Sequence, residues 1–395
     1  MTDRKNDVGT ILDALADIKD LDEYQARSLP AGYYVSEEFL ELEKEEIFPK
    51  EWICLGRLEE IGKPGDYFTT QLLDEPLIVV RGQDDKVRVL SNVCRHRSSV
   101  IAEGKGNAKN FVCPYHAWTY STDGQLLRAP SMDQVAAFDT KACQLPRLAT
   151  EIWRGFIYVN LDGKAKPLAP RLKGLEPYIQ NYHPESLDLN VVQEEVWSTN
   201  WKYLAENFLE GYHLSTVHYK TLHDRTPTRL CEKIPPGEGY TGYKSHYTRK
   251  SPQRKPYHPD LTAEEKRYSM FFWVFPSHLV GLNPGGSASL CLQPRGTDEV
   301  VNRVTFSSYS SAGAQHSGNG RIRTENNREV GFNTVMDEDR AQLVRLLRGL
   351  KSRYVEPNRL GPPDLEGTVW DMFQYMARRL APPPSRAKIK QTPLR

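Results

Sequence analysis

The 395-residue sequence lacks a long apolar run. Its best stretch, residues 270–282, contains a proline, a serine and a histidine and is too short to cross a bilayer. The first residues are polar, and no apolar stretch that could serve as a signal peptide follows them. An excess of one charge is also missing, because the formal net charge is only +1. We therefore expect a cytoplasmic protein with no membrane or nucleic-acid partner.

Cysteine is scarce, and its six residues show no spacing typical of a disulfide framework. Four of them are scattered and are most simply free, small apolar residues in a reducing compartment. The chain also lacks internal repeats, and its length is typical of two domains. The four scattered cysteines are Cys54, Cys143, Cys231 and Cys291.

The other two cysteines stand in short mixed motifs, Cys94-x-His96 and, sixteen residues later, Cys113-x-x-His116. Each motif offers one thiolate and one imidazole, which suit zinc or iron rather than the hard cations that prefer oxygen. A zinc finger usually places two cysteines on one arm and two histidines on the other. Mixed arms instead favour a Rieske [2Fe–2S] cluster, in which two cysteines hold one iron and two histidines hold the other. A structural zinc site is the alternative.

A second candidate metal site lies in residues 200–218, where a helix-like segment carries His213 and His218. Histidines five positions apart meet on one side only if the helix bulges or ends between them. Two such histidines alone are weak evidence, because one core and one surface histidine would give the same pattern. Acidic residues stand at 337–339, near the start of a helix expected over 333–354, where acids are favoured in the first turn.

Both regions resemble one known family. Residues 94–97 and 113–120 resemble the signature of ring-hydroxylating and related Rieske non-haem iron oxygenases, although that family usually has glycine where Ser98 and Ala117 stand. The Asn-Trp-Lys, Glu-Asn-Phe and Glu-x-Tyr-His groups within 200–218 resemble the iron-binding segment of the family's catalytic domain. The resemblance covers nearly the whole chain and implies both a cluster and a mononuclear iron.

The resemblance also assigns roles to single residues. It implies Cys94, His96, Cys113 and His116 as cluster ligands and His213 and His218 as iron ligands. Counting back from the Arg-Gly-Leu-Lys-Ser stretch at 348–352 favours Asp339 as the third iron ligand, with Asp337 and Glu338 as competitors. Two imidazoles and one carboxylate leave coordination positions open for dioxygen. Finally, Glu210 is implied to link His213 to a cluster histidine, His116, across subunits of a ring-shaped homotrimer.

The pattern of elements predicts an α+β protein. We expect a helical segment over 1–44 that packs on the catalytic domain, and a small antiparallel β Rieske domain over 45–165 that ends in one strand over 151–160. Residues 166–395 form the catalytic domain, for which the resemblance implies a helix-grip (START-like) fold. Residues 226–268 are expected to be irregular, covering an active site or forming a plain surface insertion. The tail 382–395 is expected to be disordered or to lie on a neighbouring subunit.

These features predict the terminal oxygenase, or alpha subunit, of a multicomponent Rieske mono- or dioxygenase. No credible dinucleotide-binding motif is present, so a separate reductase or ferredoxin must deliver electrons from NAD(P)H. The substrate is an aromatic compound, as in aromatic hydrocarbon catabolism, or another small organic molecule. An alternative is oxidative N- or O-demethylation or monooxygenation of a betaine-like quaternary amine or a methoxy compound. Two further hypotheses are a Rieske electron carrier without oxygenase activity and a zinc-stabilised binding protein.

Overall fold

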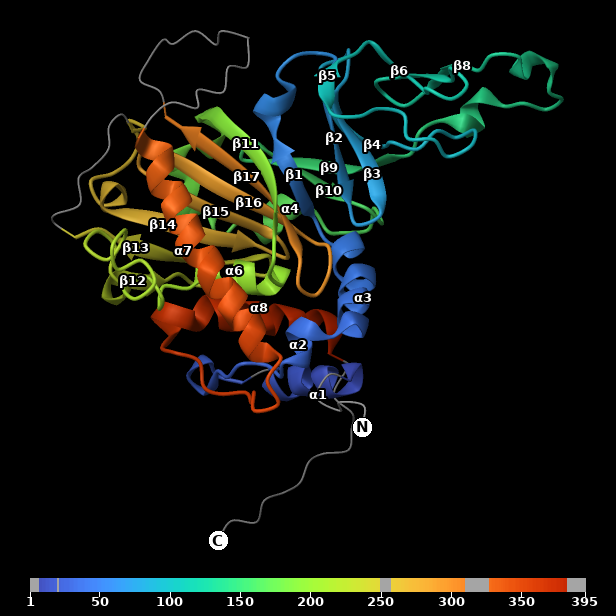
Figure 1. The fold of residues 1–395 in the computed structure, drawn as a ribbon. Coiled ribbons are helices and arrows are strands. Elements are labelled where there is room, and N and C mark those ends of the chain that lie inside the picture. Colours follow the sequence, from blue (N-terminus) through green and yellow to red (C-terminus); the bar gives the residue numbers. More distant parts are fainter. Residues whose placement is uncertain (1–6, 20, 249–256, 310–326, 382–395) are drawn as a thin grey trace.

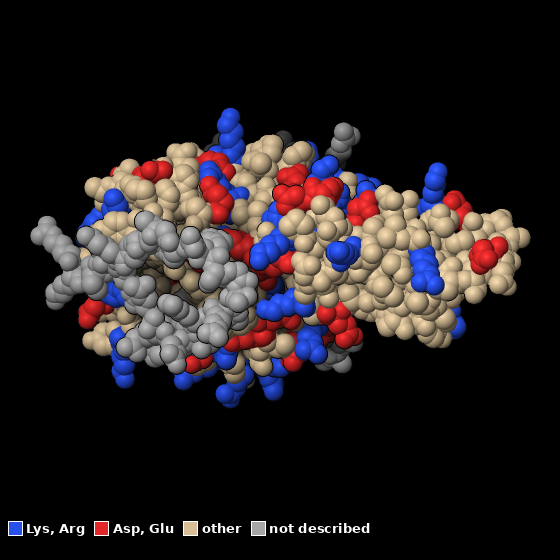
Figure 2. All heavy atoms as spheres, turned by 90° about the horizontal axis from the view of Figure 1, so that it is seen from above, with Lys and Arg blue, Asp and Glu red and all other residues tan. Residues whose placement is uncertain are grey.

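The computed structural model describes residues 7–19, 21–248, 257–309 and 327–381. They form an α+β fold built on two seven-stranded antiparallel sheets and one small three-stranded sheet (Figure 1). No helix in these ranges is both long and apolar enough to cross a membrane. Charges of both signs are interspersed on the face shown in Figure 2, without a large patch of one sign. The tail predicted over 382–395 lies outside the described residues.

The first sheet takes all its strands from residues 53–160, and the small sheet lies beside it (Figure 1). The single strand expected over 151–160 is wrong, because a turn divides this region between two strands, 147–153 and 156–160. Arg154 and Gly155 have φ values of 50° and 80°, a left-handed pair that makes a tight hairpin turn. The order is β1 (Ile53–Arg57), β10 (Phe156–Asn160), β9 (Arg147–Trp153), β4 (Val87–Ser91), β3 (Glu75–Arg81), β2 (Asp66–Leu72) and β5 (Lys105–Asn107), and the small sheet is β6 (Asn110–Val112), β7 (Thr119–Ser121) and β8 (Leu126–Arg128).

The second sheet comes from residues 188–308. The expectation of an irregular excursion over 226–268 is wrong for two parts of it, because 231–233 and 240–246 are edge strands of this sheet. The glycines and prolines around them had hidden the short strands. The order is β11 (Asp188–Trp197), β17 (Val300–Ser308), β16 (Gly286–Pro294), β15 (His278–Asn283), β14 (Tyr268–Val274), β13 (Tyr240–His246) and β12 (Cys231–Lys233).

Helices cover one face of the second sheet, and the first sheet meets its other face. Contacts join α6 to β14, β15 and β16, and α8 to β12 and β13, while α7 lies across the strands in Figure 1. On the opposite face, β1 approaches β16. The apolar face of α1 (Ile11, Leu15 and Ile18) is buried, and α1 packs on α8. The helices are α1 (Val8–Ile18), α2 (Gly32–Val35), α3 (Glu37–Glu46), α4 (Leu168–Arg171), α5 (Glu176–Ile179), α6 (Trp201–Leu209), α7 (Asn327–Leu350) and α8 (Pro363–Leu380).

A buried ion pair fixes α6 to the amino-terminal segment. Lys202 on α6 bonds Glu43 on α3, and both side chains are at most 1% exposed. The other oxygen of Glu43 accepts a 3.0 Å hydrogen bond from Trp201 Nε1, and Lys202 Nζ lies 4.5 Å from the centroid of the Tyr33 ring. Burial raises the pKa of Glu43 and lowers the pKa of Lys202. The helix that leads to the candidate iron site is therefore held by polar bonds inside an apolar core.

A second polar contact lies one turn further along α6. Glu206 is buried, and Tyr34 Oη donates to its carboxyl oxygens over 3.1 Å. Burial raises the pKa of Glu206 to about 8 despite the stabilising contacts from Tyr34 and Lys202. This raised pKa favours the protonated, neutral form of the carboxyl group.

Candidate metal centres

The two cysteine–histidine motifs form matching turns. Ser98 N–H donates to Cys94 O over 3.1 Å, and Ala117 N–H donates to Cys113 O over 3.0 Å. Both Ser98 and Ala117 have a φ of 56°, the left-handed conformation that glycine adopts without steric cost. The departures from glycine noted in the sequence therefore fall on two left-handed positions, where a Cβ is unfavourable.

The sulfur atoms lie inward and the imidazoles outward. Cys94 and Cys113 are 3% and 2% exposed, whereas His96 is exposed and its ring centroid lies 4.7 Å from that of His116. Tyr120 Oη lies 3.3 Å from Cys94 Sγ, and burial raises the pKa of this phenol, so it can donate a hydrogen bond to the sulfur. Two buried thiols and two outward imidazoles fit a two-iron cluster whose histidine side faces the surface.

A second donor set combines the segment of turns that follows α6 with α7. Ligand atoms of His213, His218 and Asp339 lie within 4.8 Å of one another. Asp339 Oδ1 is 3.0 Å from His218 Nε2 and 3.6 Å from His213 Nε2, and the two Nε2 atoms are 3.2 Å apart. Three converging donors of this kind fit one ferrous ion with open positions.

The local geometry differs from the helix expected for this segment. Helix α6 ends at Leu209, before both histidines, so neither a bulge nor an end between them brings the rings together. The carboxylate of Glu210 instead accepts hydrogen bonds from the backbone N–H groups of Tyr212 and His213. Turns then continue through His218, whose backbone oxygen accepts from Leu222 N–H over 2.9 Å.

A carboxylate holds the outer nitrogen of each histidine. Glu210 Oε1 bonds His213 Nδ1, and Glu338 Oε2 lies 2.8 Å from His218 Nδ1. Thr221 donates to the same Glu338 oxygen over 2.7 Å. With Nδ1 engaged, each Nε2 is left to face the centre, as metal-binding histidines require. Burial disfavours protonation of His218, but the carboxylates of Asp339 and Glu338 outweigh it and raise its pKa.

The structure separates the three acids that competed in the sequence. Asp339 faces the histidines, Glu338 contacts the far side of His218, and Asp337 is 71% exposed beside Arg340. The role of Glu338 was missed, and its only signal was its place next to Asp339. Within the described chain, no hydrogen bond joins Glu210 to the cluster motif.

Polar and aromatic side chains surround this centre. Asn207 Nδ2 is 3.1 Å from Asp339 Oδ1 and 3.3 Å from His213 Nε2. Phe271 on β14 contacts Phe208 at 5.7 Å between ring centroids and stacks on Tyr243 at 5.1 Å. Both Phe208 and Phe271 are only partly buried, whereas the other aromatics expected near the pocket, Phe272, Trp273 and Phe275, lie in the core.

A surface-facing cysteine–histidine cluster site and a separate two-histidine, one-carboxylate site on one chain define an iron oxygenase supplied with electrons by a Rieske cluster. Comparison with family models agrees with this class. Residues 51–139 match the Rieske [2Fe-2S] domain, and residues 178–382, more than half of the chain, match the ring hydroxylating alpha subunit (catalytic domain). The chain belongs to the family of ring-hydroxylating Rieske oxygenase alpha subunits.

Named relatives include enzymes for different substrates. The chain is 31% identical over 265 residues to a carnitine monooxygenase oxygenase subunit of Escherichia coli K12, which covers 66% of this chain and 68% of the relative. It is 37% identical over 196 residues to a glycine betaine monooxygenase oxygenase subunit of Chromohalobacter salexigens, and the match covers 49% of this chain and 44% of the relative. It is 34% identical over 210 residues to a benzene 1,2-dioxygenase alpha subunit of Pseudomonas putida, and the match covers 51% of this chain and 46% of the relative.

Solved structures show the same fold. A quaternary ammonium Rieske monooxygenase in complex with L-carnitine superposes with a TM-score of 0.76 and 23% identity, covering 92% of this chain and 98% of the other. A naphthalene 1,2-dioxygenase from a Rhodococcus species superposes with a TM-score of 0.77 and 21% identity, covering 94% and 98%. The fold alone therefore does not distinguish between their substrates.

Family membership confirms the predicted class, fold and cofactors. The protein is a Rieske non-haem iron oxygenase that uses a [2Fe–2S] cluster, a mononuclear iron and electrons from a reductase. The hypotheses of a pure electron carrier and of a zinc-stabilised binding protein are therefore wrong.

Proposed function

We propose that this oxygenase hydroxylates a quaternary ammonium compound of the carnitine or betaine kind. The observation that carries the proposal is the pair of relatives named above, a carnitine monooxygenase subunit at 31% identity over 265 residues and a glycine betaine monooxygenase subunit at 37% identity over 196 residues. This was the alternative function in the sequence analysis, and it now takes precedence over an aromatic substrate.

The aromatic wall beside the iron site supports the same substrate class. Phe208, Phe271 and Tyr243 form a contiguous group, with a stacked pair at 5.1 Å. Aromatic faces attract a quaternary ammonium group because the cation interacts with the ring quadrupole without needing hydrogen bonds. The carboxylates of Glu210 and Asp339 lie close enough to influence Tyr243, so a cation here would also meet a negative field.

We assign the metal ligands as the geometry groups them. Cys94 and Cys113 would hold the inner iron of the cluster, and His96 and His116 the outer iron. His213, His218 and Asp339 would hold the mononuclear iron, because their ligand atoms converge within 4.8 Å of one another. The mononuclear iron, when bound, supplies activation of dioxygen for attack on a C–H bond.

The protein side chains prepare this chemistry by orientation. Glu210 and Glu338 keep the Nδ1 protons of both histidines, which leaves each Nε2 lone pair free for the ion. Asn207 holds Asp339 Oδ1 from the side of α6. If the hydroxylated carbon is bonded to the substrate nitrogen, its C–N bond then breaks and releases an aldehyde, which is formaldehyde when an N-methyl group was attacked.

We further propose that the active form is a homotrimer in which Glu210 links the iron site of one subunit to His116 of the next. The carboxylate of Glu210 contacts His213 and the backbone of Tyr212, whose side chain is exposed. His116 lies near the surface of the small-sheet region. A related solved structure is described as giving insights into inter-subunit electron transfer. The domains we propose remain 1–44, 45–165 and 166–395.

A substrate panel tests the chemical proposal. The purified oxygenase with a surrogate Rieske-oxygenase reductase and NADH is given carnitine, γ-butyrobetaine, glycine betaine, benzene or naphthalene, and oxygen uptake, aldehyde and amine products are measured. We expect coupled aldehyde release with at least one quaternary amine. Ring-hydroxylated products with no aldehyde from any amine would reject the proposal and support an aromatic substrate, which the benzene dioxygenase relative favours.

A separate variant tests the electron route. Glu210→Gln should retain cluster absorption and both metals but lose coupled turnover by at least about tenfold, because the carboxylate orients His213. Single-turnover oxidation of the reduced cluster measures the transfer directly. Normal cluster oxidation in the variant would contradict the linking role. The mass in solution should be about 136 kDa, three times 45.2 kDa, and a monomer with full activity would refute the trimer.

A further inference from the structure

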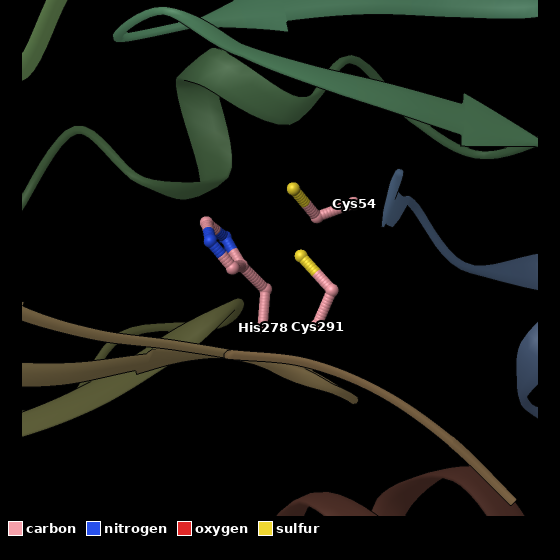
Figure 3. Close-up of side chains that lie close together, drawn as sticks. All are labelled: Cys54, His278 and Cys291. Atoms are coloured by element: carbon pink, nitrogen blue, oxygen red, sulfur yellow. The ribbon is translucent and has the colours of Figure 1, made fainter. Parts of the chain in front are cut away.

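Two cysteines and a histidine meet where the two large sheets pack together, and none of them belongs to the metal sites assigned above. Cys54 comes from β1, while His278 and Cys291 are cross-strand partners on β15 and β16. Their ligand atoms all lie within 4.8 Å of one another, and Figure 3 shows the two sulfur atoms side by side with the imidazole beside them. All three are core residues, at 1%, 1% and 3% exposed in chain order.

One ring nitrogen of this histidine has no partner. His278 Nδ1 lies 2.6 Å from Tyr158 Oη, whereas Nε2 is fully buried and makes no hydrogen bond within the described chain. Burial lowers the pKa of His278 to about 3, so the ring is neutral and carries one lone pair. When Nδ1–H donates to Tyr158, that lone pair lies on Nε2. A hydrogen-bonded Nδ1 and a free Nε2 are typical of a histidine prepared for a metal.

The spacing also suits a shared ion. Sulfur ligands lie about 2.3 Å from zinc and nitrogen ligands about 2.0 Å, so two thiolates on one ion stand roughly 4 Å apart. The observed limit of 4.8 Å requires only a small closure of the side chains. Burial raises the pKa of the Cys54 thiol, so this thiol holds its proton until a cation replaces it.

We propose that Cys54, His278 and Cys291 form a third metal site, which binds one thiophilic d10 cation, Zn²⁺ or Cu⁺. Two thiolates and an imidazole are the ligands such ions prefer. Binding forms two metal–sulfur bonds and one metal–nitrogen bond, and the two thiol protons leave to solvent. With Zn²⁺ the site is electrically neutral, which suits its burial, whereas Cu⁺ suits the count of three ligands. No change in oxidation state is needed for either ion.

The position of this site gives it a structural role. Cys54 belongs to the sheet that carries the cluster motifs, and the other two ligands belong to the sheet that faces the mononuclear iron site. One bound ion would therefore cross-link the two sheets and fix their relative orientation. The cross-link would lie beside the Tyr158–His278 hydrogen bond and the apolar contact of Trp153 with Phe272, which also join the two sheets.

Metal analysis of the intact oxygenase tests the proposal. The full-length holoprotein is incubated anaerobically with one equivalent of Zn²⁺ or Cu⁺, desalted, and analysed for iron, zinc and copper per chain. We expect about one zinc or copper in addition to the irons in wild type. The variants Cys291→Ala and His278→Gln should lose it while keeping the cluster absorption. Cys143→Ala, a partly buried cysteine outside the group, should retain it.

X-ray absorption separates this site from the mononuclear iron site, which contains no sulfur ligand. We expect two sulfur neighbours at about 2.3 Å around the added ion. A spectrum with only nitrogen and oxygen neighbours, or less than about 0.1 equivalent bound, would overturn the proposal. A Cys54–Cys291 disulfide in a non-reducing peptide map of the native protein would overturn it too. If an alanine variant is insoluble, Cys54→Ser and Cys291→Ser decide by the same measurements.

Discussion

Breaking the buried Lys202–Glu43 pair should destabilise the protein strongly. Both side chains are at most 1% exposed, so removing one partner leaves a charge without solvent or counter-ion. Such a loss costs about 3–5 kcal/mol. In Glu43→Leu the Trp201 indole N–H also loses its acceptor, which adds roughly 1–3 kcal/mol. We therefore expect Glu43→Leu to lower the free energy of unfolding by about 4–8 kcal/mol, and Lys202→Met by about 3–5 kcal/mol.

A double-mutant cycle isolates the pair. Glu43→Leu combined with Lys202→Met replaces both charges by apolar groups of similar size and should be more stable than Glu43→Leu alone, by at least about 2 kcal/mol. Urea unfolding followed by tryptophan fluorescence and circular dichroism gives the four free energies. On the same helix, Glu41 is 62% exposed beside Lys44, so Glu41→Leu should change stability by no more than about 0.5 kcal/mol.

Two results would refute this account. One is a cost below about 1 kcal/mol for Glu43→Leu, since a buried unpaired ammonium cannot be that cheap. The other is strict additivity in the double variant, which would mean that Glu43 and Lys202 do not interact. Because Lys202 stands on the helix that leads to Asn207 and His213, the single variants should also bind less iron at the mononuclear site.

Three further outcomes follow from single groups. The folded-state pKa of Glu206 is raised from 4.5 to about 8, so its contribution to stability is full below pH 4.5 and is lost as pH rises towards 8. The variant Glu206→Gln should therefore flatten the fall in Tm between pH 5 and 8. An unchanged slope of Tm against pH would contradict this expectation. Ala117→Gly should raise the free energy of unfolding of the cluster region by about 1 kcal/mol in urea titrations, because glycine adopts a φ of 56° without the steric cost of a Cβ. A loss of stability would speak against that conformation. Glu338→Ala should weaken iron binding about 10–100-fold in chelator competition by releasing His218 Nδ1, whereas Asp337→Ala should not, and equal effects would exclude a specific role.

Local motifs were predictable and long-range pairings were not. The cluster motifs are contiguous, so their ligand types were visible in the sequence. Ser98 and Ala117 stood out there as departures from the family's glycines, but their left-handed conformation was not predicted. The two histidines of the iron site were found by resemblance, but the turn that carries them was not, because a helix end before His213 leaves the same residue pattern as a bulge. The hairpin turn at Arg154 was missed because a non-glycine residue occupies a left-handed position.

Contacts between distant strands have no local signature. Glu338 was named as a competing ligand, and only the arrangement of α7 against the histidine loop shows that it holds His218 from behind. Cys54 and Cys291 were expected to be isolated thiols, since 236 intervening residues give no hint that two sheets bring them together. Sheet-to-sheet packing depends on the whole topology, so such clusters become visible only in the folded chain.

The packing of α1 on α8 sets the order in which the chain can mature during synthesis. Strands β1 to β10 can pair as soon as residue 160 has left the ribosome, so the cluster-bearing sheet can close early. The apolar face of α1 has no such opportunity, because its partner helix begins only at Pro363. Among the described helices, the earliest in the chain thus packs on the latest, and the face of α1 with Ile11, Leu15 and Ile18 lacks this partner until α8 has been synthesised.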